Sequence, residues 1–311
     1  MSRDFYSYDP QDTRDTTLRS PHRHHEPETT ETRTNRGSGD APLNGREAPE
    51  PRDKNVLKPE RDDSPRAYYV RDRAYLLRDS EIRTLGEVGR FRVVAPSDLA
   101  KYGYARDSAR MERDITRLKE QSLLTEKSLE TSQKKTLRVL TLTKAGQRLL
   151  KKTNRLPEDQ ETYHGLVKPR EAKHDADLYR LYHKEAARIE RAGGKPVRVI
   201  LDYELKRDLN RDLAVLGPEK GDPDAKELIA EKHRLRVVNG KIPVPDVRIE
   251  YETAQGELSR VDLELATRHY RPRGLAAKAR AGFSLYSRPE DASRLSRILN
   301  DQDLTAGILA L

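Results

Sequence analysis

Two acidic residues lie in a stretch whose pattern predicts a β-hairpin. Asp246 opens an alternating apolar and charged run that ends near Tyr251. After a Gln-Gly turn, a second run over Leu258–Leu265 carries Glu264 near its end. Antiparallel strands place the start of one strand beside the end of the other, so we expect the two carboxyl groups to converge.

Converging carboxylates repel one another unless a cation joins them. A Mg²⁺ ion held by Asp246 and Glu264 would help to generate hydroxide and would neutralise developing charge on a phosphate. The alternative interpretation is a pair of exposed acids that form salt bridges with Arg248 and Arg260. The spacing leaves both interpretations open.

Four arginines form a second set of residues with a chemical use. They are separated by four, three and four residues, so they share one face of a helix predicted over residues 106–121: Arg106, Arg110, Arg113 and Arg117. An arginine fork pairs with guanine edges or with phosphate. The alternative is a solvated face whose charges pair with Asp107, Glu112, Asp114 and Glu120.

The elements around this helix predict a winged helix-turn-helix domain over residues 67–154. Helices are expected over 80–89 and 96–103, and a hairpin of residues 123–129 and 137–142 follows the arginine helix. In that arrangement the third helix enters the major groove, and the hairpin tip, here with Lys134 and Lys135, lies against the backbone. Some winged helices contact proteins instead.

Residues 155–173 are expected to form a polar linker to a mixed α/β domain over 174–311. Its predicted helices cover 176–191, 203–216 and 226–235, and a strand covers 197–201. With the winged helix, the predicted fold class is α+β.

The N-terminal residues 1–66 are expected to form a disordered tail, because they hold too few aliphatic side chains to offset the entropy of folding.

Of the 311 residues, 36% are charged and 34% hydrophobic, and the formal net charge is +9. The absence of cysteine excludes disulfides and thiolate sites. Charges at the N-terminus and the lack of a long apolar run predict a cytoplasmic protein that does not bind membranes.

Short motifs in this order resemble the replication-relaxation family of bacterial and plasmid proteins. After the predicted winged helix, the motifs are His174-Asp175, Tyr203-Glu204-Leu205, Pro245-Asp246 and Leu263-Glu264-Leu265, followed by an expected helix from Lys278 to Tyr286. The second domain of that family is similar to the PD-(D/E)XK, or restriction-endonuclease-like, nuclease fold.

The resemblance implies catalytic roles for four residues. Glu204 would be the helical acid, Asp246 and Glu264 the paired acids that hold the metal, and Lys278 the cation that stabilises the transition state. The family pattern departs at Ala266, where a lysine is expected. Mg²⁺ is implied only for an active site, so the sequence leaves enzymatic activity open.

The leading hypothesis is a double-stranded DNA-binding protein that acts in replication or mobilisation of a plasmid or mobile element, or in its regulation. Protein partners of replication or conjugation fit the same role. One alternative is a Mg²⁺-dependent DNA endonuclease or nickase. Another is an adaptor whose winged helix binds a protein. The sequence indicates neither the DNA target nor the oligomeric state.

Overall fold

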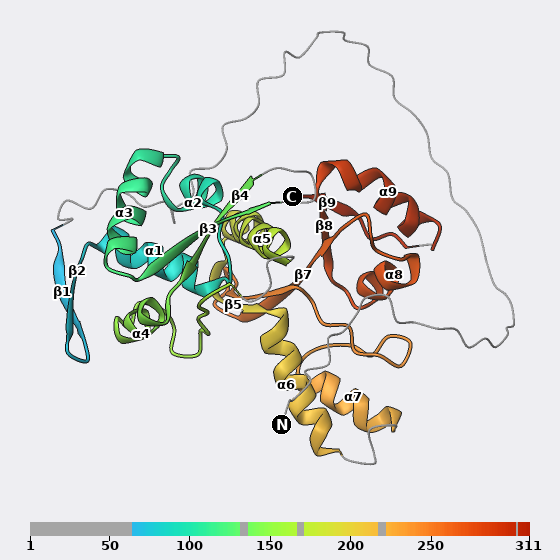
Figure 1. The fold of residues 1–311 in the computed structure, drawn as a ribbon. Helices are drawn as coiled ribbons and strands as arrows, with labels where there is room; N and C mark the ends of the chain where they lie inside the picture. Colours follow the sequence, from blue (N-terminus) through green and yellow to red (C-terminus); the bar gives the residue numbers. More distant parts are fainter. Residues whose placement is uncertain (1–63, 131–135, 167–170, 217–221, 303) are drawn as a thin grey trace, which may run out of the picture. The chain divides into compact units, whose positions relative to one another are not determined.

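The computed structural model describes residues 64–130, 136–166, 171–216, 222–302 and 304–311, which all belong to one unit of mixed α/β structure (Figure 1). The tail predicted for residues 1–66 lies outside the described residues except at its end, where Arg66 begins a strand. Lys134 and Lys135 also lie outside them. Within the described ranges, none of the helices has the length and apolar character that a bilayer span requires.

The first half of the described chain holds two small sheets and four helices. In chain order these are β1 (Arg66–Val70), β2 (Arg73–Leu77), α1 (Asp79–Arg90), α2 (Pro96–Gly103), α3 (Ser108–Glu120), β3 (Leu124–Glu130), β4 (Thr136–Leu142) and α4 (Lys144–Lys152). Strands β1 and β2 pair antiparallel, and so do β3 and β4. The three helices and the β3–β4 hairpin confirm the order of elements predicted for this region.

The β1–β2 hairpin was not predicted. One of its faces carries Tyr68, Val70, Tyr75 and Leu77, which pack into or against the main hydrophobic cluster. The other face carries Tyr69 and Leu76, both more than 60% exposed. Apolar residues on both faces hide the alternation that normally marks a half-buried strand.

The second half is built around a five-stranded mixed sheet. Its elements are α5 (Ala172–Arg191), β5 (Lys195–Leu201), α6 (Asp202–Val215), α7 (Pro223–Lys232), β6 (Val247–Glu252), β7 (Leu258–Ala266), α8 (Pro272–Arg280), β8 (Ser284–Ser287), α9 (Pro289–Asn300) and β9 (Ile308–Ala310). The strands lie in the order β5-β6-β7-β8-β9. The first three are antiparallel, and β8 and β9 continue in parallel with β7.

Alternate residues of the strands face two different cores. Val199, Ile249 and Leu265 belong to the cluster that also contains residues of α5, whereas Ala266 and Leu285 join the cluster that contains residues of α6, α8 and α9. The period of two in a strand produces this division. Glu264 therefore faces the side on which α8 lies.

The helix expected from Lys278 to Tyr286 is wrong. Helix α8 ends at Arg280, and Gly282 follows with a φ of 87°, a left-handed conformation that favours glycine and ends helices. Tyr286 instead lies in strand β8, where it pairs in parallel with Leu265. The helix and strand form one crossover from β7 to β8.

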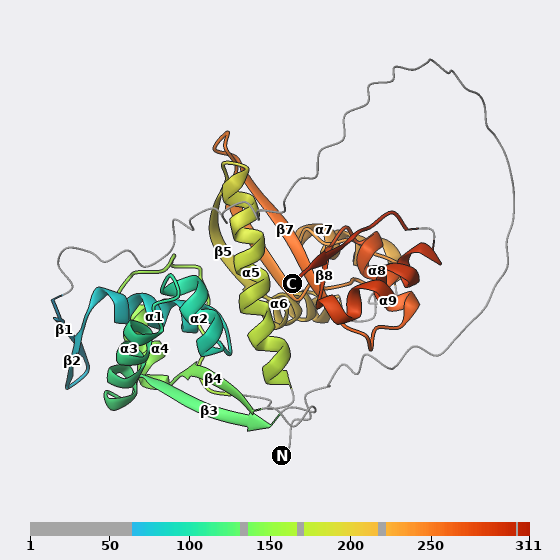
Figure 2. The ribbon, with the colours of Figure 1, turned by 90° about the horizontal axis from the view of Figure 1, so that it is seen from above.

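Helix α5 packs against α2 and β4 and also against β5, β6 and β7. Figure 2 shows α5 between the first half of the described chain and strands β7 and β8. Arg180 on α5 donates two hydrogen bonds to Asp98 on α2, at 3.1 and 3.0 Å. The main hydrophobic cluster includes residues from both predicted domains, among them Leu118 and Leu263. Part of the predicted linker is also buried, including Gln160 and Tyr163.

Candidate functional site

The arginines predicted to share one face of α3 do not all lie in that helix. Asp107 caps the helix, because its carboxylate accepts a hydrogen bond from the Arg110 backbone N–H at 2.9 Å. Arg106 precedes this cap with a φ of 69°. Its predicted place on the helix face is therefore wrong, although its side chain is exposed. Arg110, Arg113 and Arg117 remain in α3 at spacings of three and four residues.

Acidic side chains lie close to the basic residues of α3 and the β3–β4 hairpin. Arg138 on β4 donates to both Glu126 and Glu112, and Lys119 lies 2.6 Å from Glu126. A guanidinium nitrogen of Arg117 lies 3.9 Å from Glu81. The alternative interpretation expected the four arginines to pair with Asp107, Glu112, Asp114 and Glu120, but Arg117 pairs with Glu81 and Glu112 pairs with Arg138 instead. Arg113 is exposed, and its Nε donates to a backbone carbonyl of the same helix.

Asp246 and Glu264 lie at the same end of the β6–β7 hairpin. Asp246 immediately precedes β6, and its Oδ2 accepts a hydrogen bond from the Leu265 backbone N–H at 2.9 Å. The Glu264 side chain is completely buried. The alternative of exposed acids paired with Arg248 and Arg260 is wrong for these two, since Arg248 forms a two-pronged pair with Asp262 instead.

Basic and phenolic groups surround the two carboxylates. Lys278 on α8 places its Nζ 2.9 Å from Glu264 Oε1 and 3.0 Å from Oε2, and Tyr270 donates to the same carboxylate. His174 on α5 places its Nε2 3.6 Å from Asp246 Oδ1. The structure thus brings together three of the four predicted catalytic residues, and adds two that the sequence had not assigned to this cluster.

The surroundings shift the pKa values of the two acids in opposite directions. Burial and the charge of Asp246 raise the pKa of Glu264, although Lys278 and Tyr270 oppose this effect. Burial also disfavours the charged form of Asp246, but His174 and Lys278 outweigh it and hold the pKa of Asp246 below its usual range. Burial lowers the pKa of His174, yet Asp246 raises it to about 9. Each of the two carboxyl groups thus lies beside a basic side chain, Glu264 beside Lys278 and Asp246 beside His174.

This arrangement does not fit a Mg²⁺ ion. Both oxygens of Glu264 face the Lys278 ammonium, Asp246 Oδ2 accepts a backbone N–H, and His174 lies at Asp246 Oδ1. No group of three or more His, Asp or Glu side chains that could hold a metal ion occurs among the residues that the structure describes. A divalent ion would have to displace a cationic side chain from its carboxylate.

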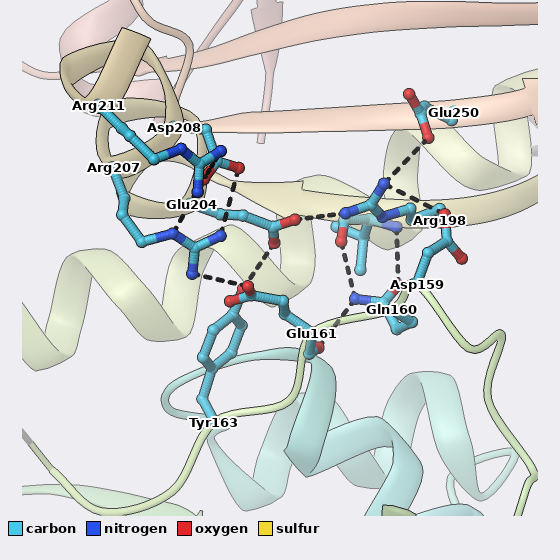
Figure 3. A network of polar contacts seen from close by, with 11 residues as sticks. Asp159, Gln160, Glu161, Tyr163, Arg198, Glu204, Arg207, Asp208, Arg211 and Glu250 are labelled. Carbon is cyan, nitrogen blue, oxygen red and sulfur yellow. Dashed lines mark hydrogen bonds and ion pairs between the residues drawn. The ribbon is translucent and has the colours of Figure 1, made fainter. Parts of the chain in front are cut away.

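Glu204 belongs to a different network, shown in Figure 3. It lies in the first turn of α6, forms an ion pair with Arg198 on β5, and accepts a hydrogen bond from Tyr163 at 3.0 Å. Arg198 also contacts Asp159 and Glu250, at 3.2 and 3.8 Å. Burial raises the pKa of Glu204 to about 7 in spite of Arg198. Glu204 thus links α6 to the segment before α5.

Sequence reasoning did not assign His174 and Tyr270 to the site. His174 occurs in the quoted His-Asp motif, but it comes from α5, about 70 residues before Asp246. Tyr270 lies in the loop between β7 and α8, six residues after Glu264. The sequence offered one signal for Tyr270, which is that this hydroxyl-bearing residue follows the predicted acid Glu264 by six positions.

A scan of protein-family models and searches of curated proteins and solved structures find no match to this chain.

Proposed function

We propose that this protein binds double-stranded DNA through a winged helix-turn-helix formed by α1, α2, α3 and the β3–β4 hairpin. The observation that carries the proposal is the position of Arg113, which is exposed on the third helix of the three that precede the hairpin. A helix in this position suits insertion into the major groove, where arginine pairs with base edges or phosphates.

The resemblance to replication-relaxation proteins gives this DNA binding a biological setting. The protein acts in the cytoplasm, in replication or mobilisation of a plasmid or mobile element or in its regulation, together with protein partners of those processes. The domain that follows is a nuclease-like domain of the PD-(D/E)XK type. Its support is the mixed sheet, which gathers Asp246, Glu264 and Lys278 at one end of β6 and β7.

Measurement of DNA affinity over a range of salt concentrations tests the proposal. Wild-type protein binds a fluorescent duplex, and its affinity falls as salt rises, because bound phosphates release counterions. Arg113→Gln lowers the slope of log affinity against log salt by about one unit if Arg113 contacts phosphate. Arg280→Gln, which removes an exposed cation from α8, leaves the slope unchanged. Wild-type protein without salt-sensitive DNA binding contradicts the proposal.

A metal-dependent DNA endonuclease is the second candidate. The support for it is the convergence of Asp246, Glu264 and Lys278 at one end of β6 and β7, although Ala266 occupies the expected lysine position. In this arrangement Lys278 contacts both oxygens of Glu264, so an active nuclease requires that a metal ion displace the ammonium group. The test incubates supercoiled DNA with Mg²⁺ or Mn²⁺ and compares wild-type protein with Asp246→Ala and Glu264→Ala. Nicking by wild type alone supports the nuclease. No nicking, or equal nicking by all three, excludes it.

The protein-interaction adaptor differs from both candidates in what the purified complex contains. Affinity purification of the adaptor recovers a stoichiometric protein and no nucleic acid. Purification of the DNA-binding protein recovers nucleic acid that high salt removes.

A further inference from the structure

Helix α4 presents a face that consists of basic side chains. Lys144, Arg148, Lys151 and Lys152 follow one another at spacings of four, three and one, so they project from one side of the helix. All four are exposed. This face lies outside the elements to which DNA contacts were assigned above.

The charges on α4 are not neutralised by side chains among the residues that the structure describes. Helix α4 has four basic and no acidic residues, whereas α3 has four basic and three acidic residues. Within the described ranges, no hydrogen bond or ion pair involves the charged groups of Lys144, Arg148, Lys151 or Lys152. Like charges three and four residues apart destabilise a helix, and Lys144 also opposes the dipole at its N-terminal end. The fold alone therefore does not account for this face.

The opposite side of α4 is fixed in the core. Leu149 and Leu150 are buried, and the backbone at Gly146 passes so close to Leu123 that an added Cβ would lie 2.2 Å from the Leu123 carbonyl oxygen. An interfacial membrane helix needs an apolar face free to enter the lipid. The apolar face of α4 is already covered, so its chemistry suits a polyanion in water.

Strand β1 packs against α4 and adds two further cations to this region. Arg66 begins β1, and Arg71 lies in the turn between β1 and β2, with both side chains exposed. Neither side chain has a hydrogen-bond or ion-pair partner among the residues that the structure describes.

We propose that α4, with Arg66 and Arg71 of the β1–β2 hairpin, forms a second contact with the phosphate backbone of double-stranded DNA. This inference rests on the proposed function and extends it, since it adds a sequence-independent surface to the one around α3. Regularly spaced cations that have no partners in the described part of the chain match the charge of a phosphate backbone. Such contacts position a protein on the duplex without reading its sequence.

The experiment compares two double variants of the full-length protein with the same spacing of the changed residues. Arg148→Gln/Lys151→Gln removes two cations from α4, and Arg294→Gln/Arg297→Gln removes two exposed cations from α9. Affinity for a fluorescent duplex is measured over a range of salt concentrations. The α4 variant is expected to lower the salt slope by about two units and to bind about 50-fold more weakly at about 0.1 M salt. The α9 variant matches wild type.

Further measurements separate failure of this inference from failure of the proposed function. If Arg113→Gln weakens binding but the α4 and α9 double variants behave alike, the second contact is wrong and DNA binding through α3 stands. If wild-type protein does not bind DNA, both proposals fail. If the α4 variant loses binding to vesicles of anionic lipid but keeps its affinity for DNA, the surface serves a membrane and the inference is overturned. Unchanged circular dichroism and thermal unfolding verify the fold of each variant.

Discussion

The ammonium group of Lys278 lies 2.9 Å from Oε1 of Glu264, and the Glu264 side chain is completely buried. These residues come from α8 and β7, so the ion pair fixes the crossover helix to the sheet. Lys278 also donates to the Val244 carbonyl at 2.7 Å, which joins the segment before β6 to the same point. A buried pair of this kind is costly to break from one side, because the Glu264 carboxylate would keep the Tyr270 hydroxyl but lose its cation.

Removal of the Lys278 ammonium is therefore expected to destabilise the protein. Lys278→Met lowers the free energy of unfolding by about 3–5 kcal/mol, since it leaves the Glu264 carboxyl group buried without its cation. Urea denaturation followed by far-UV circular dichroism measures the change. The double variant Lys278→Met/Glu264→Gln recovers part of the loss. Arg280→Met, an exposed position on the same helix, shifts stability by about 0.5 kcal/mol or less. Equal effects of the two single variants would show that the pair does not form in solution.

The amphipathic periods in the sequence were enough to predict most helices and strands. Met111, Ile115 and Leu118 are all buried on α3, at the spacings that predicted the helix. The alternation in Val247 and Ile249 likewise predicted β6, and both side chains are fully buried. These patterns are local, so no tertiary information was needed to read them.

The composition of the candidate site depended on tertiary contacts that no local pattern encodes. The role suggested for Glu204 placed it with the paired acids, but Glu204 pairs with Arg198 on the preceding strand β5. His174 reaches Asp246 only because α5 crosses the sheet. The basic residues of α4 can be counted in the sequence, but the tertiary structure is needed to show that no acidic side chain among the described residues pairs with them.

Glu204 is expected to make stability depend on pH in the neutral range. Its pKa of about 7 in the folded protein exceeds the usual value of 4.5, so folding takes up a proton between these pH values. The contribution of this group to stability is therefore constant below pH 4.5, falls by up to roughly 3 kcal/mol as pH rises to 7, and changes little above that. Urea midpoints over this range, compared with those of Glu204→Gln, isolate the contribution. Parallel pH curves for the two proteins would contradict it.

Gln160 is expected to stabilise the edge of the five-stranded sheet. Its side-chain amide donates to the Val199 carbonyl at 2.9 Å and accepts the Val199 backbone N–H at 3.0 Å, as a further strand would. Gln160→Ala leaves both backbone groups without their partner and costs about 2–4 kcal/mol of stability.

The same position supports a sharper comparison. Gln160→Glu is nearly isosteric, but it replaces the donor with an oxygen that repels the Val199 carbonyl, so it is expected to be at least as destabilising as the alanine variant. Gln255→Ala, in the exposed turn between β6 and β7, is the control and changes stability by about 0.5 kcal/mol or less. Chemical denaturation measures all three. A Gln160→Glu variant as stable as wild type would argue against the paired amide contact.

Gly146 and Gly86 are both helical glycines, but a methyl group is expected to affect them in opposite directions. At Gly146 the added Cβ would lie 2.2 Å from the Leu123 carbonyl oxygen, a backbone atom that cannot rotate away. Gly146→Ala therefore costs about 1–3 kcal/mol and displaces α4. At Gly86 the nearest atom lies 3.7 Å away on the Leu156 side chain, so alanine fits and raises stability by about 0.5–1 kcal/mol.

Thermal and urea unfolding of the Gly146→Ala and Gly86→Ala variants measure this difference in stability. Because α4 carries the proposed phosphate contact, Gly146→Ala also weakens DNA binding, whereas Gly86→Ala leaves it unchanged. Equal shifts in stability at the two positions would mean that α4 does not approach Leu123 this closely.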